Sequence, residues 1–240
     1  MLAIWKREVQ NYFLTSIGYV FIGIFVLVGG AFFALYNILS VSADLSTMLG
    51  NMNYVFMLIT PILTMKLLAE EKRNKTDQLL ITSPRSIWDI VMGKFLAAGT
   101  VVLIATVMTL FYVIVIACYS NVVYPKLIIC NYLGFLLLGL SYVAIGVLMS
   151  ALTENQVSAA VLTLGVNFLL QIIEMVGSNV TVPGLPFINT VISWFSLYTR
   201  YNEFAAGVLS FANILYYVSF CGVILFLAVR VIDKRRWSEG

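Results

Sequence analysis

Six long apolar runs alternate with short polar stretches along the 240 residues of the chain. A helix rises about 1.5 Å per residue and a bilayer's hydrocarbon core is about 30 Å thick, so a spanning helix needs about 20 apolar residues. The runs are Ser16–Leu39, Tyr54–Leu68, Ile87–Cys118, Leu127–Ala151, Val157–Val176 and Ala206–Val231. The second is short unless its helix begins near Leu49, and the third can tilt or project beyond the bilayer. The pattern predicts an all-α integral membrane protein with six transmembrane helices.

Composition supports this fold class. Hydrophobic residues make up 61% of the chain and charged residues 10%, and the mean hydropathy is +0.98. Soluble domains carry about a quarter charged residues, and a large soluble helical core would need polar faces that these runs lack. Because no 20–50-residue period repeats and no low-complexity linker is present, we expect residues 1–240 to form a single membrane domain.

Basic residues are unevenly distributed along the chain. Twelve of the 14 Lys and Arg residues fall at the N-terminus, in the 66–94 region or at the C-terminal end. With six spans, these three places lie on one side, which the positive-inside rule assigns to the cytoplasm. We therefore expect a multi-pass plasma (inner) membrane protein with both termini cytoplasmic. The net charge of +3 reflects this topology and predicts no nucleic-acid partner.

Residues 1–14 are amphipathic. Leu2, Trp5, Val9 and Tyr12 fall on one helical stripe, opposite cationic and polar residues. This pattern favours an N-terminal interfacial helix that lies in the headgroup region of the lipid bilayer. A frayed, solvated terminus is the alternative.

The stretch from 177 to 205 combines prolines, glycines and many aromatic residues. It is too interrupted for a full span and too apolar for a free loop. Two short helices that dip into the outer leaflet fit it best, forming a re-entrant segment between the fifth and sixth spans. A seventh span is the alternative, but it would place the basic C-terminus outside.

Catalytic motifs are missing from the sequence. The chain has no histidine, which excludes His-type metal sites and His-based acid–base pairs. No phosphate-binding loop, G-x-S-x-G elbow or paired-cysteine motif is present. We expect a non-catalytic subunit without cofactor or metal of its own, so the energy for driven transport would come from another polypeptide.

Charges cluster between two apolar runs in the segment 69–84, AEEKRNKTDQLLITSP. Asn74 can cap a short helix, Leu79 and Leu80 give it a small apolar patch, and Pro84 ends it. Such a helix, projecting from two long spans, can convert a push in the cytoplasm into helix tilting. On spacing alone, a solvated loop is an equal alternative.

The run EKRNKTDQLLITSP, from Glu71 to Pro84, resembles the E-[RK]-x-x-G-T-x-x-x-L-L-[TS]-x-P signature of type-2 ABC-transporter permeases. The section from Trp194 to the C-terminal end is similar to the last section of that family. The chain looks closest to the branch that includes the gliding-motility and copper-enzyme-maturation permeases. Span number and the two special segments agree with this resemblance over nearly the whole chain.

This resemblance implies the transmembrane permease subunit of an exporter. Two such chains, identical or different, would face each other, and a separate ATP-binding cassette ATPase, carrying ATP and Mg²⁺, would dock on the cytoplasmic coupling segment. Lys75 stands where the family usually has glycine, so the docking surface differs there in detail. The matched ATPase-coupling residues are Glu70, Glu71, Asn74, Lys75, Thr76, Leu79, Leu80 and Pro84.

A polar stripe follows the fifth run. Its residues are separated by four, four and three positions and therefore share one helical face: Thr163, Asn167, Gln171 and Glu174. A carboxylate facing lipid would cost about 2.5–3.5 kcal/mol, so Glu174 should face protein, water or the outer headgroups. The stripe either lines a substrate path or dimer interface, which we favour, or makes interhelical hydrogen bonds worth about 0.6 kcal/mol each.

The second span is a candidate for the opposing wall of that path, an expectation aided by the family architecture. Its polar residues are Asn51, Asn53, Thr60 and Thr64, and Pro61 can kink it.

Two rival functions belong to other classes. One is a membrane anchor, assembly or mechanical-signalling subunit that binds an ATPase without transporting a solute. The other is an intramembrane enzyme built around Glu174, against which the lack of histidine and of a second intramembrane carboxylate argues. The sequence favours none among lipid, peptide, drug, polysaccharide and copper-related cargo.

Overall fold

The computed structural model describes residues 1–74, 86–119, 124–179 and 196–238. Its elements are α1 (Leu2–Leu14), α2 (Ile17–Phe33) continuing into the π-helical η1 (Ala34–Ile38), α3 (Ser46–Thr64), α4 (Ala69–Arg73), α6 (Ile87–Tyr119), α7 (Pro125–Leu152), α8 (Gln156–Asn179), α10 (Leu197–Ala205) and α11 (Phe211–Ser238). Six helices in this part of the chain are long and apolar enough to cross a membrane. The predicted six-span, all-helical fold is confirmed.

Two span boundaries differ from the lengths of the apolar runs. The second span begins at Ser46, so it has the earlier start that its length required. The sixth begins at Phe211, five residues later than expected. Its apolar run begins at Ala206, directly after α10, and includes Gly207, which adopts a φ of 77°. This left-handed backbone suits glycine and stops a helix.

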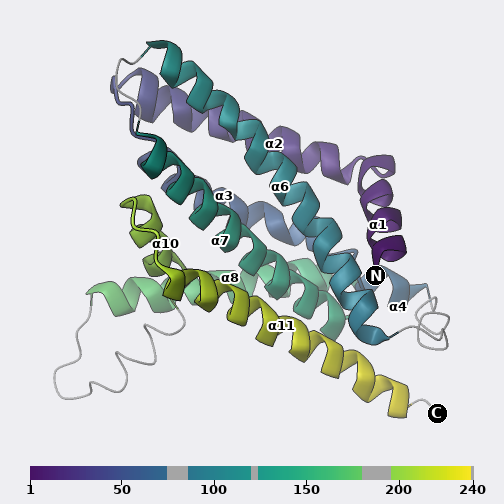
Figure 1. Cartoon of the computed structure of the whole chain (residues 1–240). Helices are drawn as coiled ribbons and strands as arrows, with labels where there is room; N and C mark the ends of the chain where they lie inside the picture. The colour runs from purple at the N-terminus through teal and green to yellow at the C-terminus, as the bar shows by residue number, and fades with distance from the viewer. Residues whose placement is uncertain (75–85, 120–123, 180–195, 239–240) are drawn as a thin grey trace, which may run out of the picture.

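The spans are not equally enclosed. In the apolar stretches of α3 and α7, 72% of the residues are buried, against 17% in α8 and 22% in α11. Figure 1 shows α3 and α7 running through the middle of the bundle, with α2 and α6 on one side and α8 and α11 on the other. The two central helices therefore form the core, and the outer helices present apolar side chains to their surroundings.

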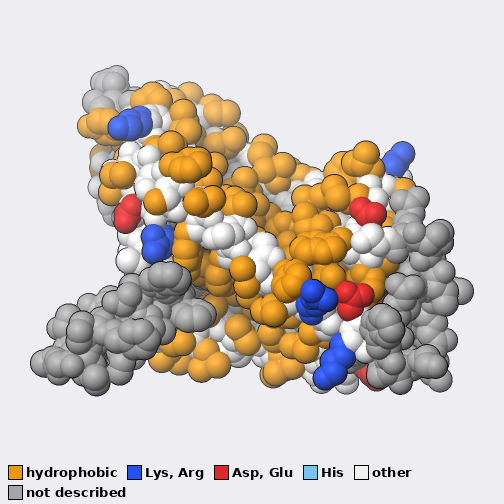
Figure 2. Space-filling model, turned by 60° about the horizontal axis from the view of Figure 1, so that its bottom comes forward, with side chains coloured by type: hydrophobic (Ala, Val, Ile, Leu, Met, Phe, Trp, Pro, Cys, Tyr) orange, Lys and Arg blue, Asp and Glu red, His pale blue; other side chains and the backbone are white. Residues whose placement is uncertain are grey.

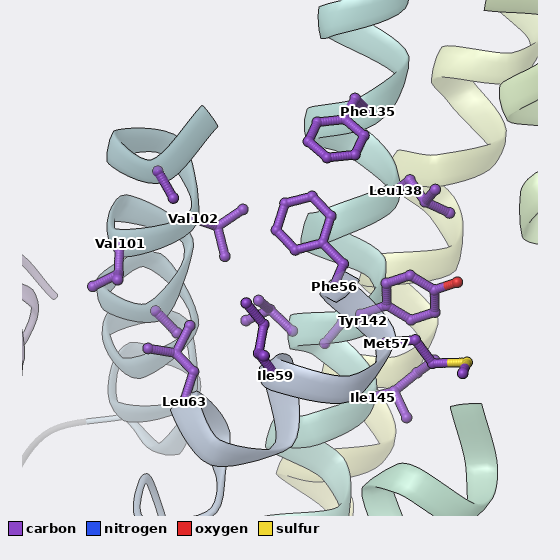
Figure 3. Close-up of a cluster of buried hydrophobic side chains, with 14 of the residues drawn as sticks. Phe56, Met57, Ile59, Leu63, Val101, Val102, Phe135, Leu138, Tyr142 and Ile145 are labelled. Atoms are coloured by element: carbon purple, nitrogen blue, oxygen red, sulfur yellow. The ribbon is translucent and has the colours of Figure 1, made fainter. Parts of the chain in front are cut away.

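Aromatic packing joins the central helices. The ring of Phe56 lies 4.6 Å from that of Phe135 and 4.7 Å from that of Phe25, measured between centroids. Figure 3 shows Phe56 of α3 between Val102 of α6 and Leu138 of α7. Burial of such rings contributes about 1.5–3 kcal/mol each relative to exposure to water, although lipid weakens this drive in a membrane.

One glycine sets the distance between α3 and α7. A Cβ atom at Gly146 would lie 2.1 Å from the Thr64 hydroxyl oxygen, which is far inside van der Waals contact. Only glycine allows this approach, as expected where helices pack closely in membranes.

The chain ends are arranged as an even number of spans requires. The N-terminus, α4 and the C-terminal end of α11 lie toward one end of the bundle, and α10 lies toward the other (Figure 1). On the face in Figure 2, hydrophobic side chains dominate a band between two zones where charged side chains gather. We refer below to the α4 end and the α10 end.

Candidate functional site

The helix α1 packs on the bundle through a face that includes a carboxylate. Ile4, Glu8 and Tyr12 are buried, whereas Leu2 is 72% exposed. The stripe that was expected to face the bilayer therefore contributes Tyr12 to the packing face, while Leu2 of the same stripe points away from it. Two hydrogen bonds fix the helix: Trp5 Nε1 donates to Thr100 Oγ1 at 2.9 Å, and the Tyr12 hydroxyl donates to the Leu63 carbonyl at 2.9 Å. Burial raises the pKa of Tyr12 well above its usual value, which keeps the hydroxyl a neutral donor.

Glu8 belongs to an ion network at the α4 end. Lys94 of α6 is 1% exposed, and its Nζ atom lies 2.8 Å from Glu71 Oε1 and 3.4 Å from Glu8 Oε1. Arg7 approaches the same two carboxylates, at 2.7 Å from Glu8 and 3.5 Å from Glu71. A buried cation is tolerated only when such partners compensate its lost hydration. The network thereby ties α1, α4 and α6 together.

The start of α4 is anchored to a second span. The Ser150 hydroxyl at the end of α7 accepts hydrogen bonds from the backbone N–H groups of Leu68 and Ala69, at 3.0 and 3.1 Å. The first N–H groups of a helix lack partners within it, so Ser150 caps α4 from another element. Lys72 Nζ also donates to the Ala151 carbonyl. Thus α4 contacts α7 through its backbone and Lys72, and it contacts α6 through Glu71.

The predicted coupling residues fall partly within the described chain. Glu70 and Glu71 lie in α4, and Asn74 takes the position directly after it, where its N–H donates to the Glu70 carbonyl at 3.0 Å. Those that lie outside the described residues are Lys75, Thr76, Leu79, Leu80 and Pro84. The short helix expected after Asn74 and its docking role stay predictions.

The polar stripe of α8 faces the bundle. Thr163 and Asn167 are 0% and 1% exposed and Glu174 is 7% exposed, while Gln171 is half-buried. The Thr163 hydroxyl donates to the Ala159 carbonyl at 2.7 Å. Because α8 packs against α3, the second span does lie opposite this stripe.

Asn167 supplies a hydrogen bond that Pro61 removes. A proline has no N–H, so the carbonyl four residues earlier loses its helical partner. Here that carbonyl belongs to Met57, and Asn167 Nδ2 donates to it at 3.5 Å, at the long end of hydrogen-bond lengths. The fifth span thus compensates the proline of the second.

Most polar groups of the second span are also satisfied within the chain. The Tyr142 hydroxyl donates to Asn53 Oδ1 at 2.9 Å. Thr60 and Thr64 donate to carbonyls one turn earlier in α3, at 2.6 and 3.1 Å. Within the described residues, Asn53 Nδ2 and Asn167 Oδ1 are buried without a partner, which leaves one donor and one acceptor available between these spans.

Glu174 stabilises the start of α10. Its carboxylate accepts from the Thr199 hydroxyl at 2.9 Å and from the Tyr198 N–H at 3.3 Å. The N-terminus of a helix favours a negative charge, and the Ser196 hydroxyl caps the same end by accepting from the Thr199 N–H at 3.3 Å. Glu174 therefore faces protein, one of the environments expected for it. The first part of the expected re-entrant segment, 180–195, lies outside the described residues, so that segment stays a prediction.

Sequence reasoning missed three participants: Glu8, Lys94 and Ser150. A lone lysine inside the long apolar run of 87–118 was the available signal for Lys94, since an intramembrane cation requires a partner. Glu8 stands among basic residues, and Ser150 has no distinguishing pattern. Both were beyond sequence reasoning because their partners are distant in the chain.

Comparison with known families defines the class. The profile of a family described as "ABC-2 family transporter protein" matches residues 36–232, which include every span except most of the first. The chain therefore belongs to the ABC-2 transporter family and is a multi-pass membrane permease. A comparison with curated proteins found no match. The helix α1, and with it Arg7 and Glu8 of the ion network, lies outside the matched residues.

Proposed function

We propose that this chain is the transmembrane half of an ATP-driven exporter of the plasma membrane. Two permease chains would form the translocation path, and a separate cassette ATPase would bind ATP and Mg²⁺ and dock on the segment that follows α4. Membership of the ABC-2 family supports an ATPase partner in general. Export, and the link to the gliding-motility and copper-enzyme-maturation branch, follow from the resemblance of the 71–84 signature.

The observation that supports the proposal is the set of contacts that joins α4 to the neighbouring helices. Its residue Glu71 pairs with Lys94 of α6, and its first N–H groups bond to Ser150 of α7. A displacement of the segment after α4 would therefore be passed directly to two spans and, through Glu8, to α1. The ion network and the Ser150 cap at its base give this segment the direct connections to two spans that a mechanical role needs.

Alternating access or a gated lateral opening would follow from this coupling. Closure of the ATPase dimer would move the 70–84 segment, and the second, third and fifth spans would reorient around the polar stripe. The contact of Asn167 with the Met57 carbonyl lies where the second and fifth spans would separate. The unpaired Asn53 and Asn167 amide atoms could be used there by a solute or by water.

The orientation is proposed on the same basis. The α4 end would face the cytoplasm, because the three basic places expected inside meet there (Figure 1). The helix α1 would then lie at the cytoplasmic headgroups.

The coupling surface can be tested in the complex of this permease with its cassette ATPase, reconstituted in lipid nanodiscs. We expect Leu79→Asp with Leu80→Asp to abolish the stimulation of ATP hydrolysis, because the apolar contact is lost. The matched control is Val208→Asp with Leu209→Asp, two residues 53% and 54% exposed beyond α10, which should leave stimulation intact. Normal stimulation in the first double variant, with the complex still assembled, would remove the docking assignment.

The anchor function is the second candidate, and one observation favours it. Much of the stripe is bonded inside the chain, since Thr163, Asn167 and Glu174 all contact protein partners. Changing Asn167, Gln171 and Glu174 together separates the two: a transporting permease should lose transport, and an anchor should keep its function. Unfolding must be measured in parallel because Glu174 also holds α10.

A further inference from the structure

A charged cavity of about 580 Å³ opens at the α4 end. It lies between α1, the start of α2, the end of α3, α4 and α6, and its lining includes Arg7, Thr15, Ile17, Lys66 and Glu70. The ion network forms one wall, since Glu8, Glu71 and the buried Lys94 also line it. The cavity is thus bordered by the same helices that the ion network joins.

Its position corresponds to the edge of the apolar band. Ile17 is the first residue of α2, and Lys66 lies in the turn between α3 and α4. A cavity bounded by the ends of two spans lies at headgroup depth in a bilayer. Near the lining residues Thr15 and Ile17 in the sequence, Leu14 is 81% exposed and Tyr19 62% exposed. An apolar residue and an aromatic one at this depth suit contact with acyl chains and the interface.

The charges of the cavity are of two kinds. Lys94 forms ion pairs with Glu71 and Glu8, and Arg7 forms an ion pair with Glu8. Lys66 and Glu70, by contrast, make no ion pair with any residue that the structure describes, although both are only partly exposed. Among the described residues, the cavity therefore offers one cation, Lys66, and one carboxylate, Glu70, that have no ion-pair partner and stand close together in the sequence.

We propose that this cavity binds the headgroup of a phospholipid that carries both a phosphate and a primary ammonium group, as in phosphatidylethanolamine. Lys66 and the exposed side of Arg7 would bind the phosphate, and Glu70 would accept hydrogen bonds from the ammonium. The acyl chains would leave past Leu14 and Tyr19. A phosphate alone would leave Glu70 facing an anion, and a quaternary ammonium could not donate to it. The bound lipid would connect α1 to α4. The assignment depends only on the site lying at the bilayer boundary and not on transport.

Native mass spectrometry of the detergent-purified chain can test this site, with phosphatidylethanolamine, phosphatidylcholine and phosphatidylglycerol of identical acyl chains. We expect phosphatidylethanolamine to be retained best. Lys66→Gln and Glu70→Gln should each weaken its retention roughly tenfold, the loss of one charge-assisted contact. Lys66→Gln should also weaken phosphatidylglycerol, whereas Glu70→Gln should not.

Matched controls use charged groups that do not line the cavity. Lys6→Gln, on the same helix as Arg7, and Asp233→Asn, near the end of α11, should leave retention unchanged. Equal retention of the three lipids, or equal losses in the control variants, would overturn the proposal.

Soluble glycerophosphoethanolamine should compete poorly, and competition as strong as that of the lipid would show that the site takes a soluble compound instead. Unfolding temperatures of all variants exclude misfolding as the cause. None of these readings depends on the ATPase.

Discussion

The two ends of the bundle each bury a charge, and they hold it in different ways. At the α4 end, Lys94 is compensated by Glu71 and Glu8, which come from two other elements. At the α10 end, Glu174 is compensated by neutral donors, among them the Thr199 hydroxyl. An ion network loses a full charge balance when one member is removed, whereas a carboxylate at a helix start loses a hydrogen bond or two. The α4 end is therefore joined across three helices, and the α10 end is held locally.

The largest effect should come from Lys94→Met. It leaves two carboxylates near each other without their buried cation, at a cost of about 3–5 kcal/mol in unfolding free energy. Denaturant unfolding of the purified chain in detergent micelles measures this loss.

A compensated variant sharpens the same test. Combining Lys94→Met with Glu71→Gln leaves Glu8 paired with Arg7 at 2.7 Å, so the charges of the network balance again and most of the stability should be recovered. Lys126→Met, an exposed lysine at the start of α7, should change little. A double variant no more stable than Lys94→Met alone would show that the network is not held by charge balance.

An intermediate effect is expected at the α10 end. Glu174→Leu deprives the Thr199 hydroxyl and the Tyr198 N–H of their acceptor, at about 1–3 kcal/mol. The damage should stay local, so hydrogen exchange should accelerate in α10, whereas Lys94→Met should accelerate it in α1 and α4. Glu174→Gln, which keeps an acceptor oxygen, serves as the control and should lose less. Equal acceleration in α1 after Glu174→Leu would contradict the contrast between the ends.

The smallest effect lies between the ends, where Asn167 compensates Pro61. Asn167→Leu should cost about 0.6 kcal/mol, the usual size of such a bond in a membrane protein. In a Pro61→Ala background the new backbone N–H can bond to the Met57 carbonyl, so the same substitution should cost less. A double-mutant cycle of unfolding free energies measures the coupling. Strict additivity would mean that Asn167 does not substitute for the missing N–H.

The six spans could be predicted from the sequence because the thickness of the bilayer sets the length of each spanning helix. Hydrocarbon thickness demands about 20 apolar residues per helix, so the six spans were predictable from length and hydropathy. The inward face of α8 was predictable as well, because the spacing of Thr163, Asn167 and Glu174 follows the helical period. The start of the sixth span was not, since the apolar run continues across the turn at Gly207.

The hydrogen-bond and ion-pair partners of the buried polar groups could not be predicted from length and hydropathy. Glu8 and Lys94 are 86 residues apart, and Asn167 and Met57 are 110 residues apart. Each pairing depends on which faces of two helices meet, and many arrangements of six apolar helices bury similar areas. Sequence periodicity gives the face of one helix but not the identity of its neighbour.

By itself, the sequence determined that the chain is a membrane protein with six membrane-spanning helices and with charge gathered between the second and third of them. It did so because the cost of placing polar backbone and charge in lipid leaves little choice. Only the tertiary structure decided that Lys94 joins α1, α4 and α6, that Ser150 caps α4, and that Glu174 holds α10. Those outcomes depend on contacts between distant segments, where a buried polar group takes whichever partner the packing of the helices brings within reach.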